Sequence, residues 1–404
     1  MSSRLSVPRP GHRVQLLEGS GEFFPALIAA IDAASRQVRL ETYIFDVTGA
    51  GTDIAQALER AARRGVSVKV VVDGFGSDSF PPPWRERFGL AGVEWRVYAP
   101  LRRFGLLWPG SWRRLHRKLC VVDGAIAFCG GINILDDFHD PNHGALESPR
   151  FDFAVQVSGP LVAEAEAAMA RLWLRMQAVH DVKQARLGGA LGSLRAYAVV
   201  RPQAAPAADD PPHARAMLVL RDNLRHRASI ERAYRRAIGH ARDEIIIANA
   251  YFVPGGKMRR ALVSAARRGV KVRLLLQGRY EYFMQYYAAR PIYGALLRAG
   301  IEINEYAPSF LHAKVAVIDG HWATVGSSNL DPLSLLLARE ANVVVEDAEF
   351  ATQLRDCLVR TMEQAGRVMN PDEFSHRPLR QRFMEGIALG LMRLALMIQG
   401  KKYL

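Results

Sequence analysis

Apolar and polar positions along the chain form blocks that predict buried strands and amphipathic helices in turn. The clearest strands are the apolar runs at residues 68–74 and 272–278, and a helical pattern precedes each of them. All predicted strands of this series lie at residues 37–45, 68–74 and 92–99 in the first half and at 244–252, 272–278 and 300–307 in the second. Each half therefore reads β-α-β-β, and strands that alternate with helices indicate an α/β fold.

The two halves repeat each other. The hexapeptide at residues 61–66 recurs unchanged at residues 265–270, between a helix and a strand in both places. We therefore predict two similar α/β domains, each a β-sheet flanked by helices, that face each other as a pseudo-twofold pair. We place the first domain at 1–195, a linker or mobile loop at 196–213, the second domain at 214–370 and a basic amphipathic tail at 371–404.

Composition and charge narrow the class of protein. The 404 residues are 49% hydrophobic and 23% charged, which is typical of a globular protein. The formal net charge of +14 favours a polyanionic partner, either nucleic acid, anionic lipid or a phosphorylated substrate. The three cysteines lack metal-ligand spacing and favour a reduced compartment. We find no signal peptide and no uncharged apolar run long enough to span a bilayer, so we expect any membrane work to occur at its surface.

Each half carries the same chemical motif. His116, Lys118 and Asp123 have the spacing His-x-Lys-x4-Asp, and the second copy has the same spacing, with His312, Lys314 and Asp319. On a strand, residues i and i+2 project from one face, so an imidazole and an ammonium group can reach the same anion.

Two His and two Lys supply what cleavage of a phosphodiester needs. One imidazole can attack phosphorus to form a phosphohistidine while the other protonates the leaving oxygen, and the lysines stabilise the charged oxygens. A small-residue segment ending in Asn follows each motif, at residues 130–133 and 326–329. We predict that Asn133, Asn329 and Ser327 bind the phosphate.

These motifs resemble the mark of the phospholipase D superfamily. Within it, residues 247–252, 321–334 and 340–342 are similar to the bacterial cardiolipin synthases of the B type, which lack N-terminal transmembrane helices. The resemblance covers about residues 14–360 and implies a metal-independent phosphatidyl transfer that uses no cofactor. The donor would be phosphatidylglycerol, the acceptor phosphatidylglycerol or phosphatidylethanolamine, and glycerol would be released when the acceptor is phosphatidylglycerol.

The resemblance also implies roles for single residues. By position, Asp152 and Glu340 would each orient a catalytic histidine, without an indication of which acid serves which histidine. By analogy the nucleophile is His116 rather than His312. The motif carboxylates, Asp123 and Asp319, are counted with the catalytic motif, although in the family they are usually more structural than chemical.

Several alternatives stay open. A phospholipase D-type hydrolase acting on phospholipid or nucleic acid would use the same chemistry, and loss of either motif would have indicated a binding protein. The basic and aromatic stretch at 101–114 and the tyrosine-rich stretch at 280–293 could contact lipid or could simply pack. The sequence of the tail predicts either a helix lying on a membrane or one packed on the second domain.

We predict a peripheral protein on the cytoplasmic face of the bacterial inner membrane. Its partner would be anionic phospholipid, with no obligatory nucleic acid and no metal, and we leave its oligomeric state open.

Overall fold

The computed structural model describes residues 7–77, 79–100, 113–140, 143–202, 214–222, 226–279, 283–331 and 338–398. The elements of the first half are β1 (Arg9–Glu18), α1 (Gly19–Asp32), β2 (Gln37–Thr42), α2 (Gly51–Arg63), β3 (Ser67–Asp73), α3 (Pro82–Ala91), β4 (Glu94–Tyr98), β5 (Arg114–Leu115), β6 (Lys118–Val122), β7 (Ile126–Gly130), β8 (His139–Asp140), β9 (Gly144–Ala145), β10 (Phe153–Ser158), α4 (Leu161–Lys183) and α5 (Leu187–Val199). Those of the second half are β11 (Ala214–Arg221), α6 (Ser229–His240), β12 (Glu244–Asn249), α7 (Gly256–Arg267), β13 (Lys271–Gln277), α8 (Phe283–Leu297), β14 (Glu302–Tyr306), β15 (Lys314–Ile318), β16 (Trp322–Gly326), β17 (Ala338–Glu346), α10 (Ala348–Ala365), β18 (Gly366–Val368), α11 (Pro371–Ser375) and α12 (Leu379–Ile398).

The six predicted strands are present, but the predicted order β-α-β-β is wrong. A helix also connects the second and third strands of each series, α3 in the first half and α8 in the second. Helix α3 begins in a run of prolines and buries only Trp84 and Phe88, one turn apart. Its apolar face is therefore too short to give a clear helical period in the sequence.

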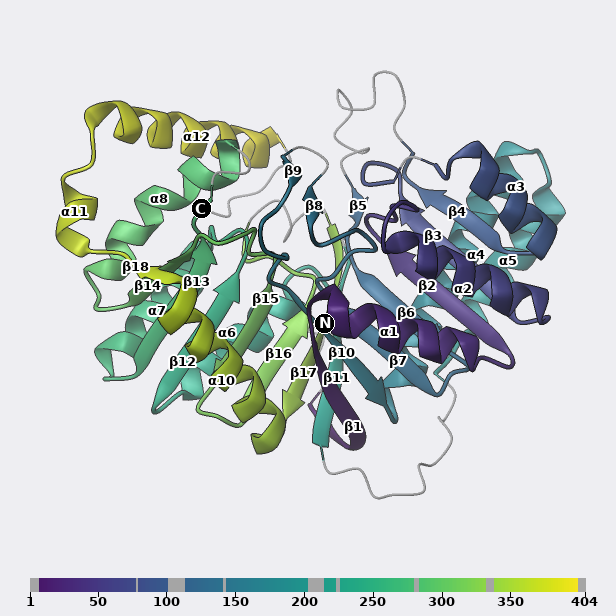
Figure 1. Ribbon diagram of the computed structural model, residues 1–404, viewed down its shortest axis with the longest axis horizontal. Helices are drawn as coiled ribbons and strands as arrows, with labels where there is room; N and C mark the ends of the chain where they lie inside the picture. The colour runs from purple at the N-terminus through teal and green to yellow at the C-terminus, as the bar shows by residue number, and fades with distance from the viewer. Residues whose placement is uncertain are drawn as a thin grey trace.

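The strands of both halves form one continuous sheet with matching strand orders. The first half runs β4-β3-β2-β6-β7-β10-β1 and the second runs β14-β13-β12-β15-β16-β17-β11, and β18 pairs with β14 at the outer edge of the second half. In each half the first three strands are parallel and the motif strand, β6 or β15, is antiparallel to its neighbours. The halves join where β1 pairs with β11 (Figure 1). This confirms the prediction of two similar α/β halves.

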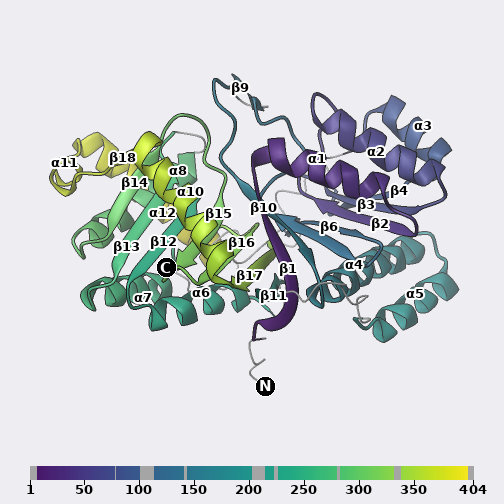
Figure 2. The same ribbon diagram turned by 60° about the horizontal axis from the view of Figure 1, so that its bottom comes forward.

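A single core runs through both halves. One cluster of buried side chains contains Leu119 and Val155 from the first half together with Val315, Val317 and Val343 from the second. Helices α4 and α10 contribute to this central cluster, whereas α1 to α3 cover the other face of the first sheet (Figure 2). The shared core fixes the two motif strands relative to each other.

The predicted linker and tail are only partly described. Helix α5 extends to Val199, so the predicted linker begins with four helical residues, and residues 203–213 lie outside the described part. In the tail, α12 packs along α8 and buries Ala388 and Met392 in the core of the second half (Figure 1). Among the described residues, no helix is both long and apolar enough to cross a membrane.

Candidate active site

The two motifs meet at the junction between the halves. His116 and His312 each stand two residues before a motif strand. The backbone N–H of His116 donates to the carbonyl of Arg339, and that of His312 donates to the carbonyl of Phe151, so each histidine is tied to the opposite half. Because Glu340 follows Arg339 and Asp152 follows Phe151, these contacts bring an acidic residue beside each histidine.

The acid pairing is crossed between the halves. Nδ1 of His116 lies 3.1 Å from the carboxylate of Glu340, and Nδ1 of His312 lies 2.6 Å from Oδ2 of Asp152. Among the residues that the structure describes, none is hydrogen-bonded to Nε2 of either histidine. A carboxylate at Nδ1 fixes the imidazole and directs Nε2 toward a substrate.

The motif lysines are buried between these pairs. Lys118 Nζ donates to the carbonyl of His116 at 2.9 Å, and Lys314 Nζ donates to the carbonyl of His312. Burial, together with the charge of Lys314, lowers the pKa of Lys118 to about 7. In their protonated forms the two lysines concentrate positive charge beside the histidines, where it would stabilise a bound phosphate.

The two acid–histidine pairs differ electrostatically. Burial would raise the pKa of Glu340, but His116 and Lys118 hold it below its ordinary value. Burial raises the pKa of Asp152 to about 6, despite the attraction of Lys314. Burial lowers the pKa of His116 and, with the two lysines, takes that of His312 well below its usual range. Burial therefore favours the neutral form of both imidazoles, and the carboxyl group whose pKa is lowered faces His116.

Residues 131 and 327, which correspond in the two repeats, explain part of this difference. Ser327 Oγ donates to Glu340 at 2.5 Å and accepts the N–H of Ala341. The hydroxyl of Ser327 thus supports the acid, and its binding of phosphate stays a prediction. At the equivalent Gly131, an added Cβ would lie 2.3 Å from Oδ1 of Asp152, so glycine leaves the space that this carboxylate fills.

The two predicted asparagines brace the loop after the first strand of each half. Oδ1 of Asn133 accepts the N–H of Ile44 at 3.2 Å, and Oδ1 of Asn329 accepts that of Tyr251 at 3.4 Å. Because only Oδ1 makes these contacts, donation from the amide nitrogen to a phosphate stays a prediction.

Sequence reasoning missed Tyr43. Its ring lies 4.9 Å from that of His116, centroid to centroid, and Nζ of Lys118 stands 5.3 Å from its centroid. A partial signal was present, because a tyrosine follows the first repeat strand in each half, but Tyr251 corresponds to Ile44, and the equivalent of Tyr43 is Ala250. Tyr43 therefore forms one wall beside the first motif.

The motif carboxylates lie at the other end of their strands. Asp123 accepts the backbone N–H groups of Ser35, Arg36 and Gln37, and Asp319 accepts those of the equivalent residues 242–244. Both have positive φ, 52° and 51°, in the turn after the strand. Asp123 and Asp319 therefore stabilise the start of the first strand of each series, and their part in the chemistry stays a prediction.

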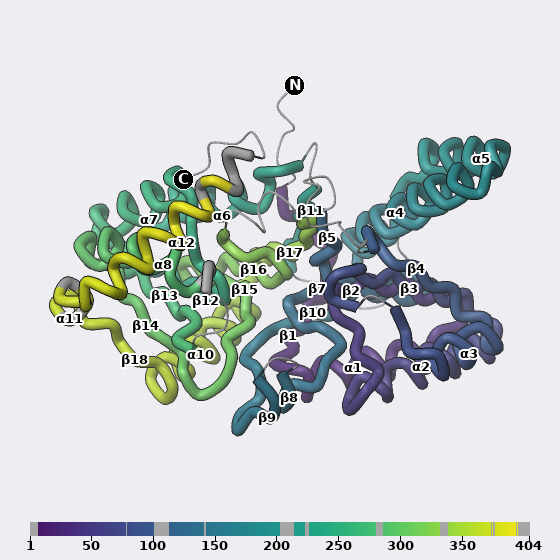
Figure 3. The backbone as a smooth tube through the Cα atoms, turned by 90° about the horizontal axis from the view of Figure 1, so that it is seen from above, coloured from purple at the N-terminus to yellow at the C-terminus, as the bar shows by residue number. Residues whose placement is uncertain are grey.

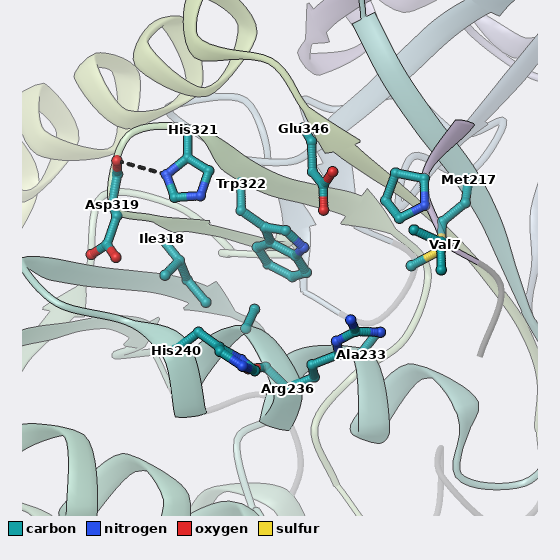
Figure 4. A pocket seen from close by; sticks show the side chains of 12 residues that line it. Val7, Met217, Ala233, Arg236, His240, Ile318, Asp319, His321, Trp322 and Glu346 are labelled. Atoms are coloured by element: carbon teal, nitrogen blue, oxygen red, sulfur yellow. Dashed lines mark hydrogen bonds between the residues drawn. The ribbon is translucent and has the colours of Figure 1, made fainter. Parts of the chain in front are cut away.

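A cavity of about 260 Å³ lies at this end of the second motif strand (Figure 4). It is lined by Asp319, His321 and Trp322, and the motif histidines and lysines do not line it. In Figure 4 the ring of His321 is hydrogen-bonded to the backbone oxygen of Asp319.

The basic and tyrosine-rich stretches of the sequence and the prediction of no metal remain to be compared with the structure. Residues 101–112 and 280–282 lie outside the described part of the chain. Among the described residues, no three His, Cys, Asp or Glu side chains form a group that could hold a metal ion.

Comparison with known proteins places these features in a family. A family model described as cardiolipin synthase, PLD-like domain, matches residues 27–173 and 234–361. Cardiolipin synthase B of Escherichia coli K12 is 38% identical over 87% of this chain and 80% of its own length, and that of Salmonella typhi is 40% identical over the same shares.

The fold is also similar to solved structures of low sequence identity. Phosphatidylserine synthase of Haemophilus influenzae matches with a TM-score of 0.67 at 13% identity, and the match covers 94% of both chains. Polyphosphate kinase of Porphyromonas gingivalis matches with a TM-score of 0.55 at 14% identity over 95% of this chain and 53% of that one.

Proposed function

The chain belongs to the cardiolipin synthase family with PLD-like domains, and from this premise we propose that it is a phosphatidyltransferase that makes cardiolipin. It transfers a phosphatidyl group from phosphatidylglycerol to a second phospholipid and releases glycerol when that acceptor is phosphatidylglycerol. The observation that carries the proposal is the crossed arrangement, in which two carboxylate-held imidazoles converge beside two buried lysines.

The reaction proceeds in two displacements. Nε2 of one histidine attacks phosphorus, a P–N bond forms and the P–O bond to glycerol breaks, while the other histidine gives its proton to the departing oxygen. That second histidine then takes the proton from the acceptor hydroxyl, whose oxygen attacks phosphorus and breaks the P–N bond. Lys118 and Lys314 offset the charge on the non-bridging oxygens in both steps.

We assign the nucleophile to His116. Its phosphorylated imidazole carries positive charge, and the carboxylate whose pKa is held low, that of Glu340, lies beside it. His312 then acts as the acid and base, because the raised pKa of Asp152 lets the His312–Asp152 pair hold a proton near neutral pH.

A soluble phosphodiester with a nitrophenol leaving group tests this division. Nitrophenol leaves without protonation, so His312→Asn should keep a single-turnover release of nitrophenol and should trap a phosphohistidine at residue 116. His116→Asn should release none. Release by the residue 116 variant with trapping at residue 312 would reverse the assignment, and wild-type turnover in either variant would refute the two-histidine mechanism.

The lipid product tests the reaction itself. Purified protein is incubated with phosphatidylglycerol vesicles and a chelator, and lipids and glycerol are resolved by mass spectrometry. Cardiolipin with equimolar glycerol is the expected result. Phosphatidic acid alone would make the protein a hydrolase, and cleavage of nucleic acid without any lipid product would make it a nuclease.

We also propose that the protein works at the surface of an anionic membrane, on the cytoplasmic face of the bacterial inner membrane. The net charge of +14 supports attraction to anionic lipid. Its three cysteines are unpaired and buried, as in proteins of a reducing compartment.

A further inference from the structure

An arginine-rich cavity lies behind the motif strands, outside the site described above. Its volume is about 360 Å³, and its walls come from α4, α5, β11, α6 and the starts of β6 and β17. Its arginines are Arg117, Arg171, Arg175, Arg221, Arg232 and Arg339.

The cavity and the catalytic residues occupy opposite faces of the same backbone. Arg117 lies between His116 and Lys118, and Arg339 immediately precedes Glu340. Because successive side chains of an extended segment point to opposite sides, these arginines leave the face away from the imidazoles. A buried ion pair with Glu41 anchors Arg117 on that side.

The cavity carries a large excess of positive charge. Asp222 is its one lining carboxylate, against six arginines. Among the described residues, no carboxylate forms an ion pair with Arg171, Arg175 or Arg339; Arg171 donates instead to the carbonyl of Val200. Guanidinium groups gathered around one space favour a phosphate, which several of them can hold at once.

The walls also offer apolar surface. Leu172, Met217 and Val219 line the cavity, and Tyr197 of α5 closes one side. Helices α4 and α5 extend together away from the body of the protein (Figure 3). Leu191 and Leu194 of α5 are 57% and 50% exposed, so an apolar surface continues outward from the cavity wall.

We propose that this cavity binds the phosphate headgroup of an anionic phospholipid that is not the reacting one, with the apolar face of α5 against its acyl region. The inference rests on the proposed function, which places the protein on a membrane of such lipids. A bound headgroup here holds the protein at the bilayer through a contact that is separate from the motif histidines.

Hydrogen exchange of the full chain locates the binding. The probes are vesicles of phosphatidylcholine with or without phosphatidic acid, a lipid with no headgroup alcohol to lose, and inorganic phosphate alone. Vesicles with phosphatidic acid should slow exchange in α4 and β11, whereas vesicles of phosphatidylcholine should not. Protection by inorganic phosphate alone, or protection confined to β6 and β15, would overturn the proposal.

Variants separate this cavity from general charge attraction. Arg171→Gln with Arg175→Gln removes two arginines of the cavity, and the control Arg186→Gln with Arg195→Gln removes the same charge outside it. The first pair should weaken vesicle binding about tenfold and the control pair by much less. Equal losses in both would overturn the proposal.

A soluble substrate keeps this test distinct from that of the proposed function. Both double variants should release nitrophenol from the soluble phosphodiester at the wild-type rate, because neither touches the motifs. If the wild type makes no cardiolipin, the proposed function fails, but protection of α4 and β11 by vesicles would still support the cavity as a lipid site.

Discussion

The contrast between Gly131 and Ser327 yields a test of how the acid at His312 works. An added Cβ at Gly131 would stand 2.3 Å and 2.6 Å from the two carboxylate oxygens of Asp152, closer than real side chains approach. Asp152 is 3% exposed. Its Oδ1, the oxygen that does not contact His312, accepts the N–H of Phe153 at 2.8 Å. Gly131→Ala should therefore push the carboxylate away from His312.

The magnitude follows from the contact that is lost. The 2.6 Å bond between Nδ1 of His312 and Asp152 involves a charged acceptor when the acid is ionised. Such bonds contribute about 1.5–3 kcal/mol, which corresponds to about a 10- to 150-fold fall in kcat. KM should change little, because neither residue is placed to bind the rest of the lipid.

Steady-state cardiolipin synthesis at pH 7 is the assay, because Asp152 is then mostly ionised while the His312–Asp152 pair can still take up a proton. Gly89→Ala is the matched control, because a Cβ there meets nothing within 4 Å. The combination Gly131→Ala with Asp152→Asn should be no slower than Asp152→Asn alone, because both changes remove one interaction. Wild-type turnover in Gly131→Ala, or fully multiplicative losses in the combination, would refute the reasoning.

The remaining predictions concern a buried charge, a turn and the core. The pKa of Lys118 is lowered to about 7, below that of a lysine in the unfolded chain. The unfolded chain therefore binds more protons than the folded one between about pH 7 and 10. The contribution of Lys118 to the free energy of unfolding rises with pH across that window. Lys118→Met should abolish turnover yet raise the melting temperature, with a margin over wild type that is largest below about pH 7 and shrinks toward about pH 10; a margin that grows with pH would contradict this sign. Asp123→Asn weakens three backbone contacts and should lower the free energy of urea unfolding by about 1–3 kcal/mol with turnover of the folded enzyme nearly unchanged, and the opposite outcome would return Asp123 to the chemistry. Cys120→Ser places a hydroxyl at a position that is 1% exposed and should cost about 1–3 kcal/mol by the same measurement, with no effect on activity below the unfolding transition.

Local patterns in the sequence predicted much of the fold because the strands are short, apolar and repeated. All six strands of the two series appear, each shifted by only a few residues at its ends. The connecting helices α3 and α8 were missed because neither shows a clear apolar period: α3 starts among prolines and α8 contains Pro291. Composition carries no information about such short packed faces.

The motifs predicted which histidines and lysines the structure brings together, but the sequence alone could not pair the acids with them. Glu340 is 224 residues from His116, and Asp152 is 160 residues from His312. The pairing depends on the way β1 joins β11 and on the core that the two halves share, which no local pattern encodes. The hydrogen bond of Ser327 could not be predicted for the same reason, since Glu340 reaches it from the neighbouring strand.

The crossed contacts explain why the repeat has to work as a pair. Each histidine has two ties to the opposite half, one through its backbone N–H and one through Nδ1. A single half would hold its strand and its lysine but would leave the imidazole without the carboxylate that fixes its tautomer. The buried cluster includes Val155 of β10 and Val343 of β17. The packing that stabilises the fold therefore also holds the histidines in place beside their carboxylates. Duplication has therefore produced one site with two unequal sides, since Glu340 is joined by Ser327 and Asp152 is accommodated by Gly131.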